Sequence, residues 1–326
     1  MDPKENLLRA IKRDAPAYLP HQYEPTWDRL AYDGAFPQDW ADGRLSWVDN
    51  WGVGWQRATV DDWGATPFPV VHPLADLSRL STYQPPDPDQ AGFTRIREGL
   101  QDPGRLHLGH LPLGPFDRAW ALVGMENFFV ALLTDFDKVK LIVEMVTDYT
   151  VRMSRRLVRA GLEMCWQTDD YGSERALMMS PDVWRRLFKP ALAEIFGVWK
   201  DAGRLVGLHS CGAVGAIVGD LVAIGLDVLH PVQASCNDAA ALKTQWGDRL
   251  SFWGGVSSRV LMGGTPADVR RETLRAMAVL GPGGGYVCGQ DQTMPYPPEN
   301  IAALAETVEQ FGAYPLRLPV TDQGRI

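Results

Sequence analysis

Cysteine is scarce in this chain, and two other common features are missing. The 326 residues include four cysteines, too few for a disulfide scaffold and typical of a reducing cytoplasm. No window of 18 residues is apolar enough for a membrane span, and the N-terminal segment lacks the apolar core of a secretory signal. With 32 basic and 40 acidic residues, the chain has no basic excess for nucleic acid. We therefore expect a cytoplasmic globular protein with no nucleic-acid or membrane partner.

Tryptophan, by contrast, is abundant in the N-terminal part. Six of the 12 tryptophans precede residue 64: Trp27, Trp40, Trp47, Trp51, Trp55 and Trp63. Such a cluster could stack on a flat ligand, or it could pack inside an N-terminal cap, which is the commoner use of aromatic side chains. Periodicity is weak between residues 20 and 100, and Pro, Gly and Asp are frequent there. We predict an irregular, Trp-rich N-terminal extension over residues 1–100 that includes a helix at 4–13 and a first strand at 17–22.

Residues 101–326 alternate between short apolar runs and amphipathic helices, a pattern typical of a parallel sheet. The predicted strands are 106–111, 163–168, 204–208, 228–232, 250–253 and 285–288. The helix at 137–160 has a regular apolar stripe and ends at Gly161. A second helix begins after Ser180, and Pro190 should kink or split it.

Six strands here and one or two in the extension make about eight, the number in a (β/α)8 TIM barrel of about 250 residues. We therefore predict an α/β fold with a single barrel, whose main body is 101–326. A doubly wound open sheet is the alternative. However, the Gly-rich segment 281–286 precedes a strand, whereas a nucleotide-binding turn would follow one.

Three side chains at predicted strand ends could bind a metal. His209 and Cys211 are separated by one residue, a spacing and ligand type that suit zinc, although a buried histidine beside a thiol is the simpler alternative. Cys288 ends another predicted strand, and in a barrel the strand ends converge on one mouth. Two sulfur ligands and one nitrogen ligand with one open position are typical of a catalytic zinc site. Cys165 and Cys236 have no such context.

Carboxylate and amide side chains follow the same strands and could act around the metal. Asp169 and Asp170 could bind substrate, orient His209 or transfer protons, or could merely cap a turn and face solvent. We predict catalytic roles for Asp170 and Asp291. We predict substrate contacts for four further residues, namely Asp169, Tyr171, Gln233 and Gln290.

Several motifs resemble the uroporphyrinogen decarboxylase superfamily over nearly the whole chain. They are WGVGW at 51–55, HPL at 72–74, PDP at 86–88, GPFDRAWALVGMEN at 114–127, DDYGS at 169–173, SPDVWRRLFKP at 180–190, HSCG at 209–212, HPVQ at 230–233, FWGGV at 252–256, GTPADV at 264–269 and PPENI at 297–301. The resemblance implies a (β/α)8 barrel. It leaves activity open, because the superfamily contains both decarboxylases and corrinoid-dependent methyltransferases.

Two features of the resemblance favour the methyltransferase branch. The Arg-rich segment of the kind RQAGRY, with which decarboxylases grip porphyrinogen carboxylates, does not occur before residue 100, and Arg175 is the one arginine predicted near the mouth. The methylcobalamin:thiol methyltransferases use His-x-Cys and a late cysteine as zinc ligands, which implies this role for His209, Cys211 and Cys288.

The resemblance therefore implies a zinc-dependent methyltransferase of a corrinoid system. Its cofactors would be Zn²⁺ and methylcobalamin carried by a corrinoid-binding partner protein, and its substrate a small methyl donor or acceptor. The direction of transfer stays open, as does the oligomeric state, with a homodimer as one option. A metal-free decarboxylase and a non-catalytic corrinoid-partner module are the alternatives.

Overall fold

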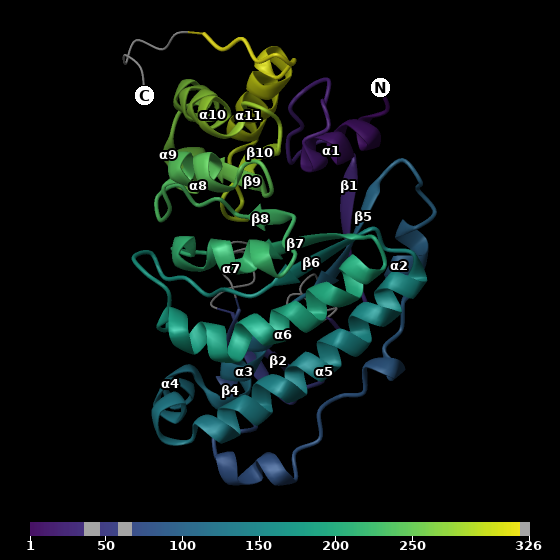
Figure 1. Cartoon of the computed structure of the whole chain (residues 1–326), viewed down its shortest axis with the longest axis vertical. Helices are drawn as coiled ribbons and strands as arrows, with labels where there is room; N and C mark the ends of the chain where they lie inside the picture. Colours follow the sequence, from purple (N-terminus) through teal and green to yellow (C-terminus); the bar gives the residue numbers. More distant parts are fainter. Residues whose placement is uncertain (36–45, 58–66, 320–326) are drawn as a thin grey trace.

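A curled sheet of seven parallel strands organises the chain (Figure 1), as seen in a computed structural model that describes residues 1–35, 46–57 and 67–319. Strand order in the sheet follows the chain, so each strand pairs with the next in parallel. The strands are β1 (Trp27–Ala31), β5 (Leu106–Leu111), β6 (Met164–Thr168), β7 (Leu205–His209), β8 (Val228–His230), β9 (Ser251–Val256) and β10 (Tyr286–Gln290). The sheet is TIM-barrel-like, which confirms the predicted fold class, and all six strands predicted after residue 100 are present.

Helices cover the outer face of this sheet, and long α5 packs along α6 (Figure 1). The α-helices are α1 (Pro3–Lys12), α2 (Thr94–Gly99), α3 (Pro115–Val123), α4 (Met125–Thr134), α5 (Phe136–Ala160), α6 (Pro181–Asp201), α7 (Val218–Ala223), α8 (Ala239–Trp246), α9 (Ser258–Gly263), α10 (Pro266–Leu280) and α11 (Pro298–Phe311). Short 3-10 helices are η2 (Leu77–Ser81), η3 (Pro88–Gln90) and η4 (Gly215–Ile217). No helix in these described parts is long and apolar enough to cross a bilayer.

Local sequence explains where the main helices begin and end. Gly161 ends α5 with a φ of 106°, a conformation that glycine adopts without strain. The Ser180 hydroxyl accepts a hydrogen bond from the Val183 amide at the start of α6. Of the kink or split expected at Pro190, the split does not occur, because α6 continues through Pro190 as one helix, and the kink stays a prediction.

Apolar side chains fill the interior of the curled sheet. Alternate strand residues point inward. Leu7 and Ile11 of α1 pack against these residues and fill one end of the interior. The buried members of this inner cluster are Leu7, Ile11, Leu106, Leu108, Met164, Trp166, Val228, Trp253 and Val287. The opposite face of each strand packs against the helices in a second, larger core. Whether the last residue of a strand faces inward or outward therefore decides whether it reaches the mouth, the open end of the sheet at the carboxyl ends of the strands.

The N-terminal segment closes the sheet differently from the prediction. Residues 17–22 form no regular strand: Tyr18 and His21 make only isolated bridges, the latter to Cys288. Pro20 lacks an amide hydrogen, which limits strand pairing there. Even so, the Cys288 amide donates to the Pro20 carbonyl at 2.9 Å, so the segment covers the free edge of β10. The first strand of the sheet is β1, which the sequence analysis missed.

A small antiparallel sheet stands where irregular structure was expected. It consists of β2 (Ser46–Val48), β3 (Gly54–Gln56) and β4 (Phe68–Val71), and Trp47 pairs with Trp55 across it. Trp51 and Trp55 are buried, and the Trp51 ring lies 4.9 Å from that of Tyr149 on α5. These two tryptophans therefore act as packing residues. Trp40 and Trp63 lie outside the described residues.

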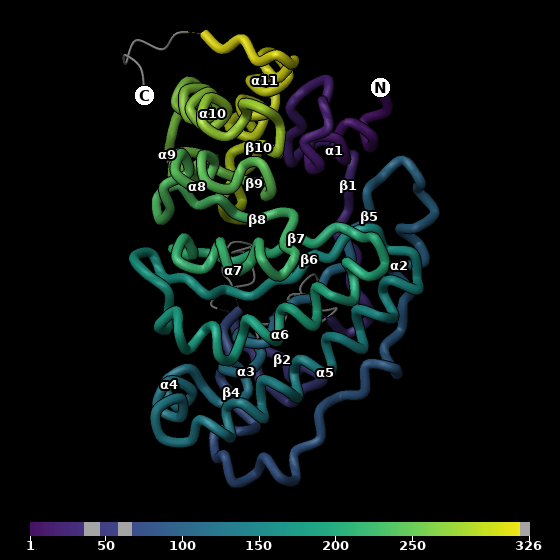
Figure 2. Tube along the Cα trace, viewed as in Figure 1, coloured from purple at the N-terminus to yellow at the C-terminus, as the bar shows by residue number. Residues whose placement is uncertain are grey.

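The chain between this small sheet and β5 runs along the outside of α5 (Figure 2). Arg152 on α5 forms ion pairs with Asp87 at 2.6 Å and Asp89 at 2.5 Å, and Arg156 donates to the Ala91 carbonyl at 2.8 Å. These contacts attach the N-terminal part to the outer helical layer.

Candidate functional site

Polar side chains gather where three adjacent strands end. Register pairs Thr168 on β6 with His209 on β7, and His209 with His230 on β8. All three continue the inward-facing series of their strands, above Met164, Trp166 and Val228 of the inner core. The carboxyl ends of β6, β7 and β8 therefore form one polar layer over an aromatic base, in which the Trp166 and His230 rings lie 5.0 Å apart.

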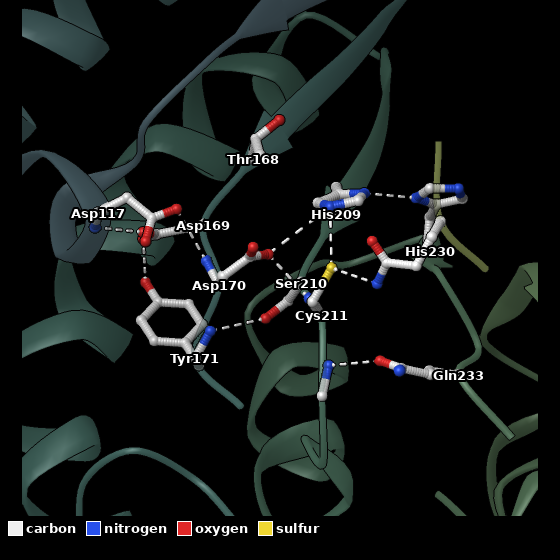
Figure 3. A network of polar contacts seen from close by, with 12 residues as sticks. Asp117, Thr168, Asp169, Asp170, Tyr171, His209, Ser210, Cys211, His230 and Gln233 are labelled. Carbon is white, nitrogen blue, oxygen red and sulfur yellow. Dashed lines mark hydrogen bonds and ion pairs between the residues drawn. The ribbon is translucent and has the colours of Figure 1, made fainter. Parts of the chain in front are cut away.

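Three residues in this layer could hold a metal ion. The ligand atoms of Asp170, His209 and Cys211 all lie within 4.8 Å of one another, and each side chain is half-buried (Figure 3). The Cys211 sulfur is 3.3 Å from His209 Nε2, and that nitrogen is 3.6 Å from Asp170 Oδ1. Among residues 1–35, 46–57 and 67–319, no other set of three such ligands is this close.

His230 fixes how His209 presents its ring. The two Nδ1 atoms are 2.7 Å apart, so one must donate a proton to the other. Burial lowers the pKa of both imidazoles, which keeps them neutral near pH 7. If His209 carries its proton on Nδ1, its Nε2 lone pair faces Cys211 and Asp170, as a metal ligand requires.

The surroundings of Cys211 favour its protonated thiol form. Burial raises its pKa, and the negative charge of Asp170 adds to this effect. Gln292, beyond β10, donates an amide hydrogen to the sulfur at 3.2 Å. A cation at this position would reverse the balance, since it stabilises the thiolate and releases the proton.

Close contact between two loops positions Asp170 against Cys211. The Cys211 amide donates to Asp170 Oδ1 at 2.8 Å, and the Ala213 amide donates to the Ser173 carbonyl at 2.7 Å. Gly172 and Gly212 permit this approach: a Cβ on Gly212, which has a φ of 80°, would lie 2.4 Å from the Gly172 carbonyl carbon. The sequence motifs DDYGS and HSCG thus need their glycines for backbone packing.

Asp169 and Tyr171 were expected to contact substrate, and the structure corrects both assignments. Both side chains are fully buried, and the Tyr171 hydroxyl donates to Asp169. Asp169 also accepts from the Asp117 amide at 2.8 Å and the Phe116 amide at 3.2 Å, at the N-terminus of α3. Asp117 in turn accepts from the Asp170 amide at 3.0 Å. This buried network of Asp117, Asp169 and Tyr171 lies beside Asp170 and holds its backbone amide in place (Figure 3).

Cys288 was expected as the third metal ligand, and the structure corrects this too. Val287 belongs to the inner core, so the next residue, Cys288, points outward and packs in the outer core. It is fully buried, and burial raises the pKa of its thiol to about 12. Cys288 does not join the Asp170–His209–Cys211 group.

Asp291 is not a member of this group either, and the predicted substrate contact of Gln290 stays a prediction. Asp291 was expected to be catalytic, but its buried carboxylate accepts from the Ser258 amide at 2.9 Å and caps the start of α9. Gln290 is buried as well. Gln233 accepts from the Gly212 amide at 2.9 Å, which places it beside the HSCG loop, and its contact with substrate stays a prediction.

Three residues of the mouth were not predicted as site residues. His230 could have been found from the period-two alternation that starts at Val228. Gln292 lies in a loop with no periodic signal. Arg29 is on β1, which was itself missed; it is near enough to His209 and His230 to lower the pKa of both.

Comparison with known proteins agrees with this architecture. No curated protein is found to be similar to the chain. Among solved structures, a methyltransferase from Methanosarcina mazei matches with a TM-score of 0.67 at 19% identity, covering 94% of this chain and 98% of that one. A B12-independent methionine synthase from Shewanella sp. W3-18-1 matches with a TM-score of 0.45 at 12% identity, covering 77% and 72%. The family model described as uroporphyrinogen decarboxylase (URO-D) matches residues 61–311, more than half of the sequence. The chain therefore belongs to the uroporphyrinogen decarboxylase family.

Proposed function

We propose that this protein is a zinc-dependent methyltransferase that moves a methyl group between a corrinoid and a small substrate. The observation that carries the proposal is the Asp170–His209–Cys211 group at the mouth of a URO-D family barrel. The similarity in fold to a Methanosarcina mazei methyltransferase supports the reaction class. A separate corrinoid protein as methyl carrier is part of the proposal and rests on the sequence resemblance described above.

The donor set fits zinc. A thiolate, an imidazole and a carboxylate are all ligands that zinc accepts, whereas magnesium and calcium prefer oxygen and do not select a thiolate. The thiolate of Cys211 and the carboxylate of Asp170 together carry two negative charges, which balance Zn²⁺. Three protein ligands leave one position for substrate, as in catalytic zinc sites.

Bound zinc would supply Lewis-acid chemistry, since it stabilises a sulfur, oxygen or nitrogen atom in its anionic form. The protein's own residues prepare the centre for this role. His230 holds the His209 ring in one orientation, and Gln292 directs an amide hydrogen at the Cys211 sulfur. The Cys211 amide fixes the Asp170 carboxylate. Trp166 and Trp253, whose rings are 5.3 Å apart, belong to the inner apolar cluster on which the site lies.

The proposal is tested with purified, zinc-loaded protein, methylcobalamin and 2-mercaptoethanol as the thiol. Loss of the methylcobalamin absorption band, together with formation of the methyl thioether, measures transfer. We expect Cys211→Ser to lose both zinc and transfer, and Cys288→Ala, the matched control, to keep both. Protein that binds no zinc, or that transfers methyl groups equally well after chelation, would refute the zinc-dependent mechanism.

A second candidate is decarboxylation without metal, and one observation favours it. Arg29 is near enough to His209 and His230 for its charge to lower the pKa of both. The sequence analysis expected no arginine near the mouth other than Arg175, and a cation there suits a carboxylate substrate. This candidate predicts release of CO2 by metal-free protein, a reaction that Cys211→Ser would leave intact.

A further inference from the structure

The Cys211 sulfur has a contact that comes from a distant strand of the sheet. Gln292 follows β10, whereas Cys211 follows β7, and strands β8 and β9 lie between the two in the sheet. The sheet is curled, so a side chain beyond β10 can still meet the loop after β7. Gln292 Nε2 donates a hydrogen bond to the sulfur at 3.2 Å, and His209 Nε2 lies at a similar distance of 3.3 Å.

A chain of hydrogen bonds holds Gln292 in this position. The Tyr296 hydroxyl lies 2.6 Å from the Gln292 carbonyl oxygen and 2.5 Å from the Ser258 hydroxyl. A carbonyl can only accept, so Tyr296 donates to Gln292 and accepts from Ser258. Ser258 begins α9, and its amide donates to the Asp291 carboxylate at 2.9 Å. The backbone is therefore anchored on both sides of Gln292.

The Gln292 amide interacts more strongly with a metal-bound sulfur than with a free thiol. A metal-bound cysteine is a thiolate, and hydrogen bonds to ionised acceptors are roughly twice as strong as those to neutral ones. Because the amide favours the metal-bound form, it adds to the affinity for the metal. Hydrogen bonds to a ligand sulfur also change the electronic properties of the metal centre.

We propose that Gln292 is a positioning residue for Cys211: its amide orients the sulfur toward Asp170 and His209 and stabilises the thiolate that binds the metal. This inference rests on the metal binding of the proposed function, and it does not depend on methyl transfer. The loop after β10 then supplies a hydrogen-bond donor to the site, whereas the sequence resemblance implied a second sulfur ligand from β10.

Gln292→Met tests the inference, because methionine has a similar length and no polar hydrogen to donate. The zinc affinity, measured by chelator competition, should fall by about 10- to 100-fold. In protein loaded with Co²⁺, the sulfur-to-cobalt charge-transfer band should move to longer wavelength, because the sulfur electrons lose a stabilising hydrogen bond. Gln245→Met, at an exposed position of α8, is the matched control and should match the wild type in both measurements. A wild-type band position in Gln292→Met would overturn the inference, because a merely structural effect can weaken binding without moving the band.

Tyr296→Phe tests whether the anchored backbone matters. It removes the hydroxyl that fixes the Gln292 carbonyl and leaves the Gln292 side chain in place. Zinc binding should weaken by less than in Gln292→Met, and the double variant should bind zinc as Gln292→Met does, because Tyr296 acts through the amide. Fully additive losses in the double variant would contradict this role of Tyr296.

An experimental structure of the zinc-loaded wild-type protein needs no variant and covers the case in which Gln292→Met does not fold. The Gln292 amide nitrogen should lie within hydrogen-bond distance of the Cys211 sulfur, and a side chain turned away from it would overturn the inference. If the protein binds zinc with this contact but transfers no methyl group, the inference stands and the proposed function fails. If it transfers methyl groups and Gln292→Met keeps the wild-type cobalt spectrum, the reverse holds.

Discussion

Replacing Gly212 with alanine should separate the two loops that build the candidate metal site. The new Cβ would lie 2.4 Å from the Gly172 carbonyl carbon and oxygen, against 3.4 Å or more in ordinary contacts. The backbone would therefore have to move by about 1 Å. Left-handed backbone at a φ of 80° costs alanine about 1–2 kcal/mol. Loss of the Gly172–Cys211 and Ala213–Ser173 hydrogen bonds adds about 1 kcal/mol each.

Gly212→Ala should thus lower the free energy of unfolding by about 3–4 kcal/mol and weaken zinc binding, because Asp170 and Cys211 lie on the separated loops. Urea unfolding and competition with a chelator measure the two effects. Gly203→Ala is the matched control: Gly203 has a φ of 69° and open space around its Cβ position. It should cost about 1–2 kcal/mol and leave zinc affinity unchanged. If the two variants behave alike, loop packing does not position the site.

Three further predictions concern single side chains. Asp170→Asn should weaken zinc about 100-fold in a chelator competition, since one ligand supplies roughly a quarter of the zinc-binding free energy; unchanged affinity would exclude Asp170 as a ligand. His230→Phe removes the Nδ1 partner of His209 and should weaken zinc by about 10- to 100-fold; equal affinities would mean that the partner is dispensable. Burial lowers the pKa of Lys243 to about 8, so the unfolded chain binds more protons between about pH 8 and about pH 10. Relative to Lys243→Met, the wild-type free energy of unfolding should rise over this range by up to about 1.4 kcal/mol per pH unit. If the difference in unfolding free energy between the wild-type protein and Lys243→Met, measured by urea titration, does not change with pH, the pKa of Lys243 is not lowered.

The later strands could be predicted because both of their faces are buried. The run at 106–111 is buried at every position and matches β5 in full. β1 could not be found in this way, since Trp27 and Arg29 face the interior while Asp28 faces outward, so that no apolar run marks the strand. The small sheet β2–β4 consists of segments of three or four residues, too short for periodicity to detect.

The site was predictable to the level of the strand ends. The carboxyl ends of parallel strands meet at one edge of the sheet, which predicted that Asp170, His209 and Cys211 lie near one another. The structure places them together. The prediction failed for Cys288 because a strand end defines an edge and says nothing about the face. Val287 faces the interior of the sheet, so its neighbour Cys288 faces the opposite side and packs in the outer core. The approach of Gln292 to Cys211 depends on a loop conformation that no local pattern encodes.

X-ray absorption at the zinc edge of the loaded protein tests the central claim most directly, because it counts sulfur ligands. If Asp170, His209 and Cys211 hold the metal, the spectrum will fit one sulfur at about 2.3 Å and nitrogen or oxygen ligands at about 2.0–2.2 Å. The Cys288→Ala variant should give the same spectrum. Two sulfur ligands in the wild-type protein, reduced to one in Cys288→Ala, would contradict the account.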